Sequence, residues 1–331
     1  MAGEFPLKKW ASNDPNILQN MPEENLAQPS CRTWLPYESH STLGLHWHPR
    51  SDTFTFTIPS IESKLATCLK GLEWDTPLPP EDGEYWRAFL TDLPQLTKLR
   101  VPRWCHWSTI APVVELHGFA DASESVYAAV VYLRTKGNPD DSDWTTTLLT
   151  AKTKVTPLKQ ISLPRLELSA ATLLSRVVHH VQKTLDLTQR PTHLWSDSTV
   201  TLGWIRGHPS RWMTFVANKV SEIQTMLVDA HWHHVASQDN PADCASRGVS
   251  PGELASHPLW WHGPGWLAIE NEPWRSEPEQ RETELPEQRT RTHLAQGQEE
   301  EPEILVRYSS LQRLLRISLV STMVNGAVTQ S

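Results

Sequence analysis

The stretch "LHGFADASESVYAAVVYLR" (residues 116–134) places a carboxylate, Asp121, between two apolar runs. The first run ends at Asp121, a turn of small polar residues follows, and the second run begins at Val126. Two such runs joined by a short turn predict neighbouring β-strands. A lone Asp at the end of a strand is most often a turn former or a helix cap, so the role of Asp121 depends on its surroundings.

The sequence around this stretch continues as an alternation of strands and helices. "TTTLLTAKTKV" (145–155), "THLWS" (192–196) and "HWHHVAS" (231–237) are typical of strands. Apolar residues recur at helical spacing from Pro164 onward, and further helices are expected from about 198, over about 212–227 and from "NPADCASRG" (240–248), where Asn240 would be the N-cap. The predicted order over 111–250 is β-β-β-α-β-α-α-β-α.

Four acidic residues lie at the ends or beginnings of these elements: Asp121, Glu167, Asp197 and Asp243. If the first and fourth strands are adjacent and parallel, both aspartates emerge at one edge of the sheet, where the two helix starts can approach them. Four clustered carboxylates repel one another unless cations neutralise them, and hard ions such as Mg²⁺ or Mn²⁺ prefer oxygen ligands. Taken singly, Glu167 and Asp243 also suit the start of a helix, and Asp197 suits a cap.

The motifs that carry these acids resemble a known family. "FADAS", "LPRLELSA", "WSDSTVTLGWI" and "HHVASQDNPADCASRG" resemble the ribonuclease H domain in the pol polyprotein of BEL/Pao-type LTR retrotransposons. The resemblance implies an α/β fold, with a five-stranded mixed sheet flanked by helices. It also implies that Asp121, Glu167, Asp197 and Asp243 are catalytic residues that hold two Mg²⁺ or Mn²⁺ ions.

The resemblance extends to both sides of this unit. "TLGLHWHPRSDTFTF" resembles the end of that family's reverse transcriptase, and "GLEWDTPLPPE" its connection region. "HPLWWHGPGWL" and "YSSLQRLLRISLV" resemble the passage into integrase and the start of that module. The expected division is a reverse transcriptase remnant, a shortened helical connection, the ribonuclease H-like domain, a disordered Pro/Glu-rich linker and an amphipathic helix, over 1–58, 59–110, 111–250, 251–303 and 304–331.

The implied activity is two-metal hydrolysis of the RNA strand of an RNA–DNA hybrid. The sequence contains no Tyr-x-Asp-Asp polymerase motif and no Asp-Thr/Ser-Gly protease triplet, and no integrase catalytic acids are recognised. A catalytically silent retroelement remnant that binds nucleic acid or protein is the alternative. The expected partners are the hybrid and, in a retroelement, the rest of a polyprotein.

Six further residues are candidates for binding nucleic acid: Arg165, Ser198, Trp204, Arg206, Arg211 and Trp212. The last four flank the "GHPS" loop and alternate basic with aromatic side chains, which suits a strand of the hybrid. Packing explains the tryptophans equally well, and an ion pair explains Arg165 equally well. Ser198 is better explained as the start of a helix.

Composition and charge limit the remaining possibilities. The net charge of −8 argues against a nucleic-acid partner, but residues 270–303 carry eleven acidic and four basic side chains, so the acidity belongs to the tail. Four separated cysteines favour a reducing compartment, and neither a signal peptide nor a membrane span is visible. The expected location is therefore cytoplasmic or nuclear. His231, His233, His234 and Cys244 are spaced for a strand and a buried thiol rather than for zinc.

Overall fold

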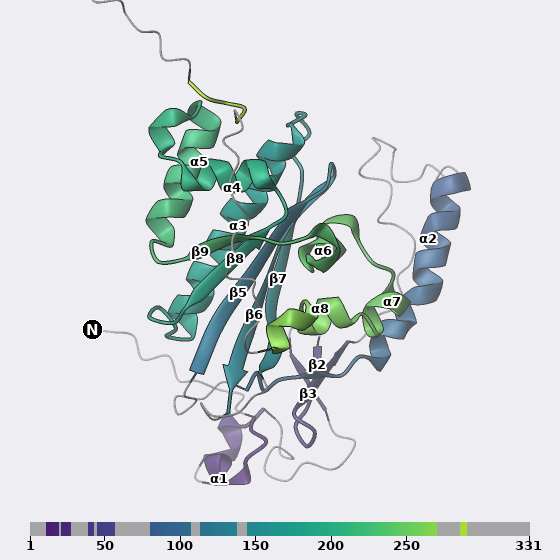
Figure 1. The fold of residues 1–331 in the computed structure, drawn as a ribbon. Helices are drawn as coiled ribbons and strands as arrows, with labels where there is room; N and C mark the ends of the chain where they lie inside the picture. The colour runs from purple at the N-terminus through teal and green to yellow at the C-terminus, as the bar shows by residue number, and fades with distance from the viewer. Residues whose placement is uncertain are drawn as a thin grey trace, which may run out of the picture. The chain divides into compact units, whose positions relative to one another are not determined.

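A computed structural model describes residues 11–19, 21–27, 39–42, 45–56, 80–106, 113–137, 144–269 and 285–289. Two units divide the chain, 1–288 and 289–331. The first unit holds all the described elements, and its main feature is a five-stranded sheet in the order β7-β6-β5-β8-β9 (Figure 1). Its strands are β5 (Val113–Ala122), β6 (Val126–Lys136), β7 (Thr145–Val155), β8 (Thr192–Ser196) and β9 (His231–His234).

The pairing of β5 determines where its terminal carboxylate lies. On one side β5 pairs antiparallel with β6, with Asp121 opposite Ala128. On the other side it pairs parallel with β8, from Leu116 opposite Thr192 to Ala120 opposite Ser196. Asp121 and Asp197 each come directly after the last of these pairs, so the expected meeting of the two aspartates at one edge of the sheet is confirmed.

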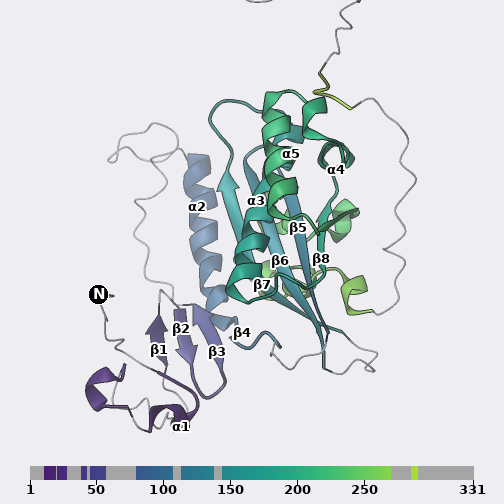
Figure 2. The same ribbon diagram turned by 90° about the vertical axis from the view of Figure 1, so that its left-hand side faces the viewer.

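Helices cover both faces of this mixed sheet (Figure 1, Figure 2). Helix α3 (Leu163–Thr184) lies on one face with α4 (Thr199–Arg206) and α5 (Thr214–Met226) beside it. Its apolar stripe packs on alternate residues of β5, so that a Cβ added at Gly118 would lie 2.7 Å from Leu174 Cδ1. Helix α6 (Ala242–Arg247) lies on the other face, where Phe119 and Trp195 are buried. The predicted element order and five-stranded mixed sheet are confirmed.

The linker predicted from residue 251 is wrong over its first part. Residues 251–268 form α7 (Pro251–Ala255), α8 (Pro258–His262) and the 3-10 helix η6 (Gly265–Ala268). Leu267 is fully buried against Phe119, Tyr132 and Trp195. The Tyr132 hydroxyl donates to the carbonyls of Leu259 and Trp260 at 3.2 and 2.7 Å. The segment lacks periodicity because it is held by single anchor residues rather than by a continuous stripe.

A buried charged network also holds this segment to the sheet. Arg134 on β6 donates to the carbonyls of Leu267 and Ile269 at 2.7 and 2.8 Å, and to Glu115 on β5 at 2.7 Å. Burial would raise the pKa of Glu115, but hydrogen bonds from His117 and Arg134 outweigh it and lower the pKa to about 2. The ion pair therefore stays charged inside the protein, and its arginine satisfies the backbone carbonyls of Leu267 and Ile269.

The residues before the main sheet form a smaller antiparallel sheet in the order β1-β2-β3-β4. Strands β2 (Leu45–His48) and β3 (Thr53–Phe56) form a hairpin, and the described part of the expected helical connection is α2 (Pro80–Asp92), which continues into η3 (Leu93–Lys98). The remaining elements are α1 (Pro15–Leu18), η1 (Glu23–Asn25), β1 (His40–Thr42) and β4 (Val101–Pro102).

Some predictions fall on residues outside the described ranges. They are the part of the helical connection before residue 80, the amphipathic helix at 304–331, and the linker except for 251–269 and 285–289. Within the described ranges, no helix combines the length and the apolar character needed to span a bilayer.

Candidate active site

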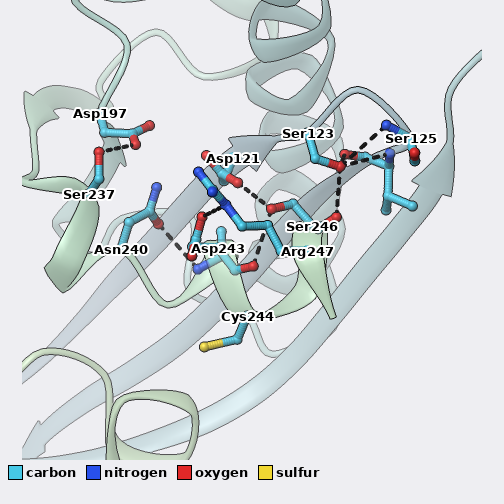
Figure 3. Close-up of polar contacts among 12 residues, drawn as sticks. Asp121, Ser123, Ser125, Asp197, Ser237, Asn240, Asp243, Cys244, Ser246 and Arg247 are labelled. Carbon is cyan, nitrogen blue, oxygen red and sulfur yellow. Dashed lines mark hydrogen bonds and ion pairs between the residues drawn. The ribbon is translucent and has the colours of Figure 1, made fainter. Parts of the chain in front are cut away.

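Asp121 is the most enclosed of the four predicted acids. Its exposed fraction is 4%, and the Ser246 hydroxyl of α6 donates to its Oδ2 (Figure 3). Burial raises the pKa of the Asp121 carboxyl, and the nearby charges of Asp197 and Asp243 raise it further, while the Ser246 hydrogen bond opposes the change. Two of the other three acids therefore lie close enough to act electrostatically on the Asp121 carboxyl.

Asp197 follows β8 and precedes α4. Its Oδ2 accepts a hydrogen bond of 2.7 Å from Ser237 Oγ, in the 3-10 helix η5 (Ser237–Asp239) (Figure 3). Its Oδ1 is buried and has no hydrogen-bond partner. A buried carboxylate oxygen without a donor is costly, so this atom is open to a ligand that the protein does not supply.

Glu167 reaches the site from the start of α3. Burial raises its pKa to about 7, and the charges of Asp197 and Asp121 add to the effect, although a hydrogen bond from Ser198 lowers it. The Glu167 side chain is therefore directed into the acidic cluster, and its pKa is about 7.

Asp243 enters the site on α6, which Asn240 fastens to the sheet. Asn240 is fully buried; its Nδ2 donates to the carbonyl of Ala120 at 3.1 Å, and its Oδ1 accepts from the Ala242 amide at 3.1 Å. These two bonds hold the first turn of α6 beside the end of β5 (Figure 3). The Arg247 guanidinium donates to the Asp243 carboxylate one turn later on the same helix.

The four acids come together, but not as a preformed ligand set. No three His, Cys, Asp or Glu side chains in the described part of the chain are grouped as a metal site. Each carboxylate instead has its own donor: Ser246, Ser198, Ser237 and Arg247. Mutual repulsion explains this arrangement, because each ionised carboxylate is stabilised by turning toward the nearest donor.

The residues present nevertheless fit divalent cations. All four side chains offer oxygen, the ligand atom that Mg²⁺ and Mn²⁺ prefer. Asp197 Oδ1 is buried without a donor, and the pKa values of the Asp121 and Glu167 carboxyls are raised by burial and further by their acidic neighbours. Positive charge at this point would relieve both conditions.

The surrounding donors were not recognised from the sequence. Ser246 and Arg247 follow Asp243 by three and four residues, so their helical spacing placed them on the same side of α6 as the acid. Asn240 was expected only as a helix cap, and its bond to Ala120 depends on the tertiary fold. Nothing in the local pattern marks Ser237.

The structure separates the six nucleic-acid-binding candidates into two groups. Trp204 and Trp212 are 1% and 0% exposed, and their indole N–H groups donate to the carbonyls of Pro286 and Trp204. Burial leaves neither ring a free face for stacking on a base, which supports the packing interpretation. Ser198 is the N-cap of α4, as expected for the start of a helix, and its hydroxyl accepts from the Thr201 amide.

The three arginines keep some exposure. Arg206 donates to the Trp232 carbonyl at 3.2 Å, and Arg211 lies over the Trp212 ring at 5.3 Å. Arg165 makes the ion pair considered as its alternative: its Nε and Nη2 donate to the two carboxylate oxygens of Glu287, each at 2.9 Å. Arg165 is thus the member of the group closest in sequence to a site acid, and an acidic side chain already holds it.

The strand histidines His117, His193 and His233 pack against one another. His193 Nδ1 lies 3.1 Å from His233 Nε2, and the His193 ring stacks on His117 at 5.0 Å between centroids. Burial lowers the pKa of His193 to about 3 and that of His233 to about 4. Neutral, packed rings agree with the structural role expected for His233.

Comparison with known proteins supports the fold. Residues 57–198 match the family model described as "Pao retrotransposon-like RNaseH-like domain". The matched range contains Asp121, Glu167 and Asp197. No curated protein sequence matches the chain. The chain has a ribonuclease H-like fold, as the family match and the β7-β6-β5-β8-β9 sheet indicate.

Solved structures with a similar course of the chain are remote. The N-terminal ribonuclease H domain of Rv2228c from Mycobacterium tuberculosis is 11% identical, with a TM-score of 0.31, over 44% of this chain and 99% of the other. LC11 ribonuclease H1 in complex with an RNA/DNA hybrid is 9% identical, with a TM-score of 0.28, over 38% of this chain and 88% of the other. The foamy viral protease-reverse transcriptase in complex with such a hybrid is 11% identical, with a TM-score of 0.26, over 54% of this chain and 27% of the other.

Proposed function

We propose that the chain is a ribonuclease H-type hydrolase that cleaves the RNA strand of RNA–DNA hybrids at Asp121, Glu167, Asp197 and Asp243. The observation that carries the proposal is the parallel register of β5 and β8, because its last pair, Ala120 opposite Ser196, is followed on each chain segment by an aspartate. Glu167 and Asp243 approach these aspartates closely enough to perturb carboxyl pKa values.

The four carboxylates would hold two divalent cations, Mg²⁺ or Mn²⁺. Such a pair of ions neutralises charge on a phosphodiester and activates water for hydrolysis. The protein's own groups orient the carboxylates: Ser246 positions Asp121, Ser237 positions Asp197, and Asn240 fixes the helix that carries Asp243. Burial and the charges of Asp197 and Asp121 raise the pKa of Glu167, and a bound cation would favour its ionised, ligating form.

A second candidate is a catalytically silent, nucleic-acid-binding remnant. The observation that favours it is that donors already occupy the carboxylates: Arg247 pairs with Asp243, and Ser246 bonds Asp121. In this reading the acids serve the packing of α6 on the sheet, and the surface binds without cleaving.

A cleavage assay separates the two. The full chain is incubated with end-labelled RNA–DNA hybrid and Mg²⁺, beside Asp121→Asn, Asp197→Asn and the control Asp229→Asn, whose exposed side chain lies outside the site. We expect cleavage by the wild type and the control, and none by the two site variants. If hybrid is bound but all four chains are inert, the silent alternative is correct and the enzymatic proposal fails.

A further inference from the structure

A short C-terminal segment lies across the helices next to the candidate active site. We call residues 285–288 the strap. Leu285 packs on α4, where a Cβ added at Gly203 would lie 2.6 Å from Leu285 Cδ1. The Pro286 carbonyl accepts from Trp204 Nε1 at 2.9 Å, and the Glu287 carbonyl accepts from the Met213 amide at 2.8 Å. Gln288 forms an antiparallel bridge with Trp212.

A bidentate ion pair between Glu287 and Arg165 also holds the strap in place. Both carboxylate oxygens of Glu287 accept from Arg165, whose guanidinium also lies 5.0 Å from the Phe215 ring. The Glu287 side chain is 17% exposed and that of Arg165 35% exposed, so the pair is partly shielded from water. A guanidinium fork binds carboxylate and phosphate in the same bidentate geometry, so Glu287 occupies a position that a phosphate would also fit.

Arg165 lies on the same helix as Glu167, and side chains two residues apart leave a helix in different directions. It stands two residues before Glu167 in the first turn of α3, and the strap's other partners lie on α4 and in the loop before α5. Helix α4 begins at Thr199, two residues after Asp197. The strap thus crosses the two helices whose starts adjoin Glu167 and Asp197.

The segment that carries the strap is itself polyanionic. Residues 270–303 contain eleven acidic and four basic side chains, whereas residues 111–250 contain thirteen of each. A nucleic-acid backbone is the competing polyanion for the same cations. Charge therefore favours the strap as a substitute for nucleic acid rather than as a neutral packing element.

We propose that the strap is an autoinhibitory contact, in which the Glu287 carboxylate takes the place of a backbone phosphate on Arg165 and must leave before the hybrid binds. The proposal rests on the proposed function, because it names the regulation of that same site. Displacement exposes Arg165 and the surface of α4 that Leu285 covers, beside the acids.

The test measures hybrid binding by the full chain in EDTA, where no cleavage interferes. Glu287→Gln removes the charge of the ion pair and Leu285→Asn weakens the apolar contact, so the two variants loosen the strap independently. Each should bind a fluorescent hybrid roughly three- to tenfold more tightly than the wild type, as expected when a covered surface becomes available more often.

The control is Glu222→Gln, which breaks the ion pair between Arg176 on α3 and Glu222 on α5, whose Nε–Oε1 distance is 2.5 Å. This pair lies about 16 Å farther along α3, at 1.5 Å per residue, so its loss should leave hybrid affinity unchanged. A strap that only stabilises the fold predicts lower melting temperatures with unchanged or weaker binding, and that result overturns the proposal.

Hydrogen exchange gives a second readout that is independent of the substitutions. The Met213 amide donates to the Glu287 carbonyl, so saturating wild-type chain with hybrid should speed its exchange. An amide that stays equally protected in the complex overturns the inference. If the variants bind hybrid more tightly but no chain cleaves it in Mg²⁺, the strap inference stands and the proposed hydrolysis fails. If all chains bind and cleave the hybrid equally, the proposed hydrolysis stands and the strap inference fails.

Discussion

At the scale of single residues, the site is a balance between carboxylates that repel one another and donors that restrain them. Asp121, Asp197 and Glu167 lie within electrostatic reach of each other, and serine hydroxyls offset only part of the repulsion. Such a cluster is less stable than a neutral one would be, which is a common cost of functional sites. The cost should be measurable in the ion-free protein.

Glu167→Gln should stabilise the chain in EDTA at pH 8. Because the folded-state pKa of Glu167 is raised from 4.5 to about 7, its contribution to stability is fully present below pH 4.5 and is lost as the pH rises to about 7. The amide has no such loss, so the free energy of unfolding at pH 8 should rise by about 1–3 kcal/mol.

Urea titrations at pH 5 and pH 8 check this sign. The wild type should lose more stability than Glu167→Gln between the two values. Equal losses in both chains would show that Glu167 titrates normally and that the acids are not electrostatically coupled. Mg²⁺ at pH 8 should then stabilise the wild type more than the variant.

Arg134 is a second residue whose contribution is large because it is buried. Its guanidinium is 1% exposed and donates hydrogen bonds to Glu115 and to the carbonyls of Leu267 and Ile269. Arg134→Met leaves the buried Glu115 carboxylate without its cationic partner, so the free energy of unfolding should fall by about 3–5 kcal/mol.

The matched control for this change is Arg176→Met. Arg176 is 53% exposed and pairs with Glu222 on the surface, so its loss should cost less than about 1 kcal/mol. Chemical denaturation of the two variants gives the comparison. Similar losses at both positions would mean that the buried network carries no special weight.

At the scale of elements, the close packing of α3 on β5 brings Glu167 to Asp121. Gly118 allows this approach, because a Cβ there would lie 2.7 Å from Leu174 and 3.0 Å from Leu194. Both neighbours are fully buried leucines without room to move. The sheet and helix are therefore in contact at the point where a side chain would hold them apart.

Gly118→Ala should destabilise the chain by about 1–3 kcal/mol through overpacking. Gly265→Ala is the control, since a Cβ at Gly265 meets no atom within 4 Å, and its effect should stay within about 0.5 kcal/mol. Thermal denaturation of both variants tests the contact. Stability gained at position 118 would show that α3 packs less tightly than described.

At the scale of the whole molecule, the ribonuclease H-like unit extends beyond residue 250, its predicted end. Leu267 and the carbonyls of Leu259, Trp260 and Ile269 complete the face of the sheet that carries Phe119 and Tyr132. Without them the buried Arg134 loses two of its acceptors and the Tyr132 hydroxyl loses both of its carbonyl partners. The functional unit must therefore include residues 251–269.

Truncation tests this boundary. A chain that ends at residue 269 should unfold cooperatively, whereas one that ends at 250 should bind a dye for exposed apolar surface and melt at a lower temperature. Circular dichroism and dye fluorescence give the comparison. Identical melting curves would show that the C-terminal helices are dispensable for the fold.

The sequence by itself determined the order of strands and helices and the placement of the four acids, because both follow from local patterns. Alternation marks strands, three- and four-residue spacing marks helices, and a parallel pair of strands brings Asp121 and Asp197 to one edge. The hairpin of β2 and β3 was predictable for the same reason.

Only the tertiary structure decided how distant residues are used. Trp204 and Trp212 look alike on a surface and in a core until the strap is placed beside them. Arg134 binds carbonyls more than 130 residues away in the chain, and Glu287 reaches Arg165 over a similar separation. These contacts join single anchor residues rather than periodic stripes, so no local pattern records them, and the folded sheet alone brings the partners together.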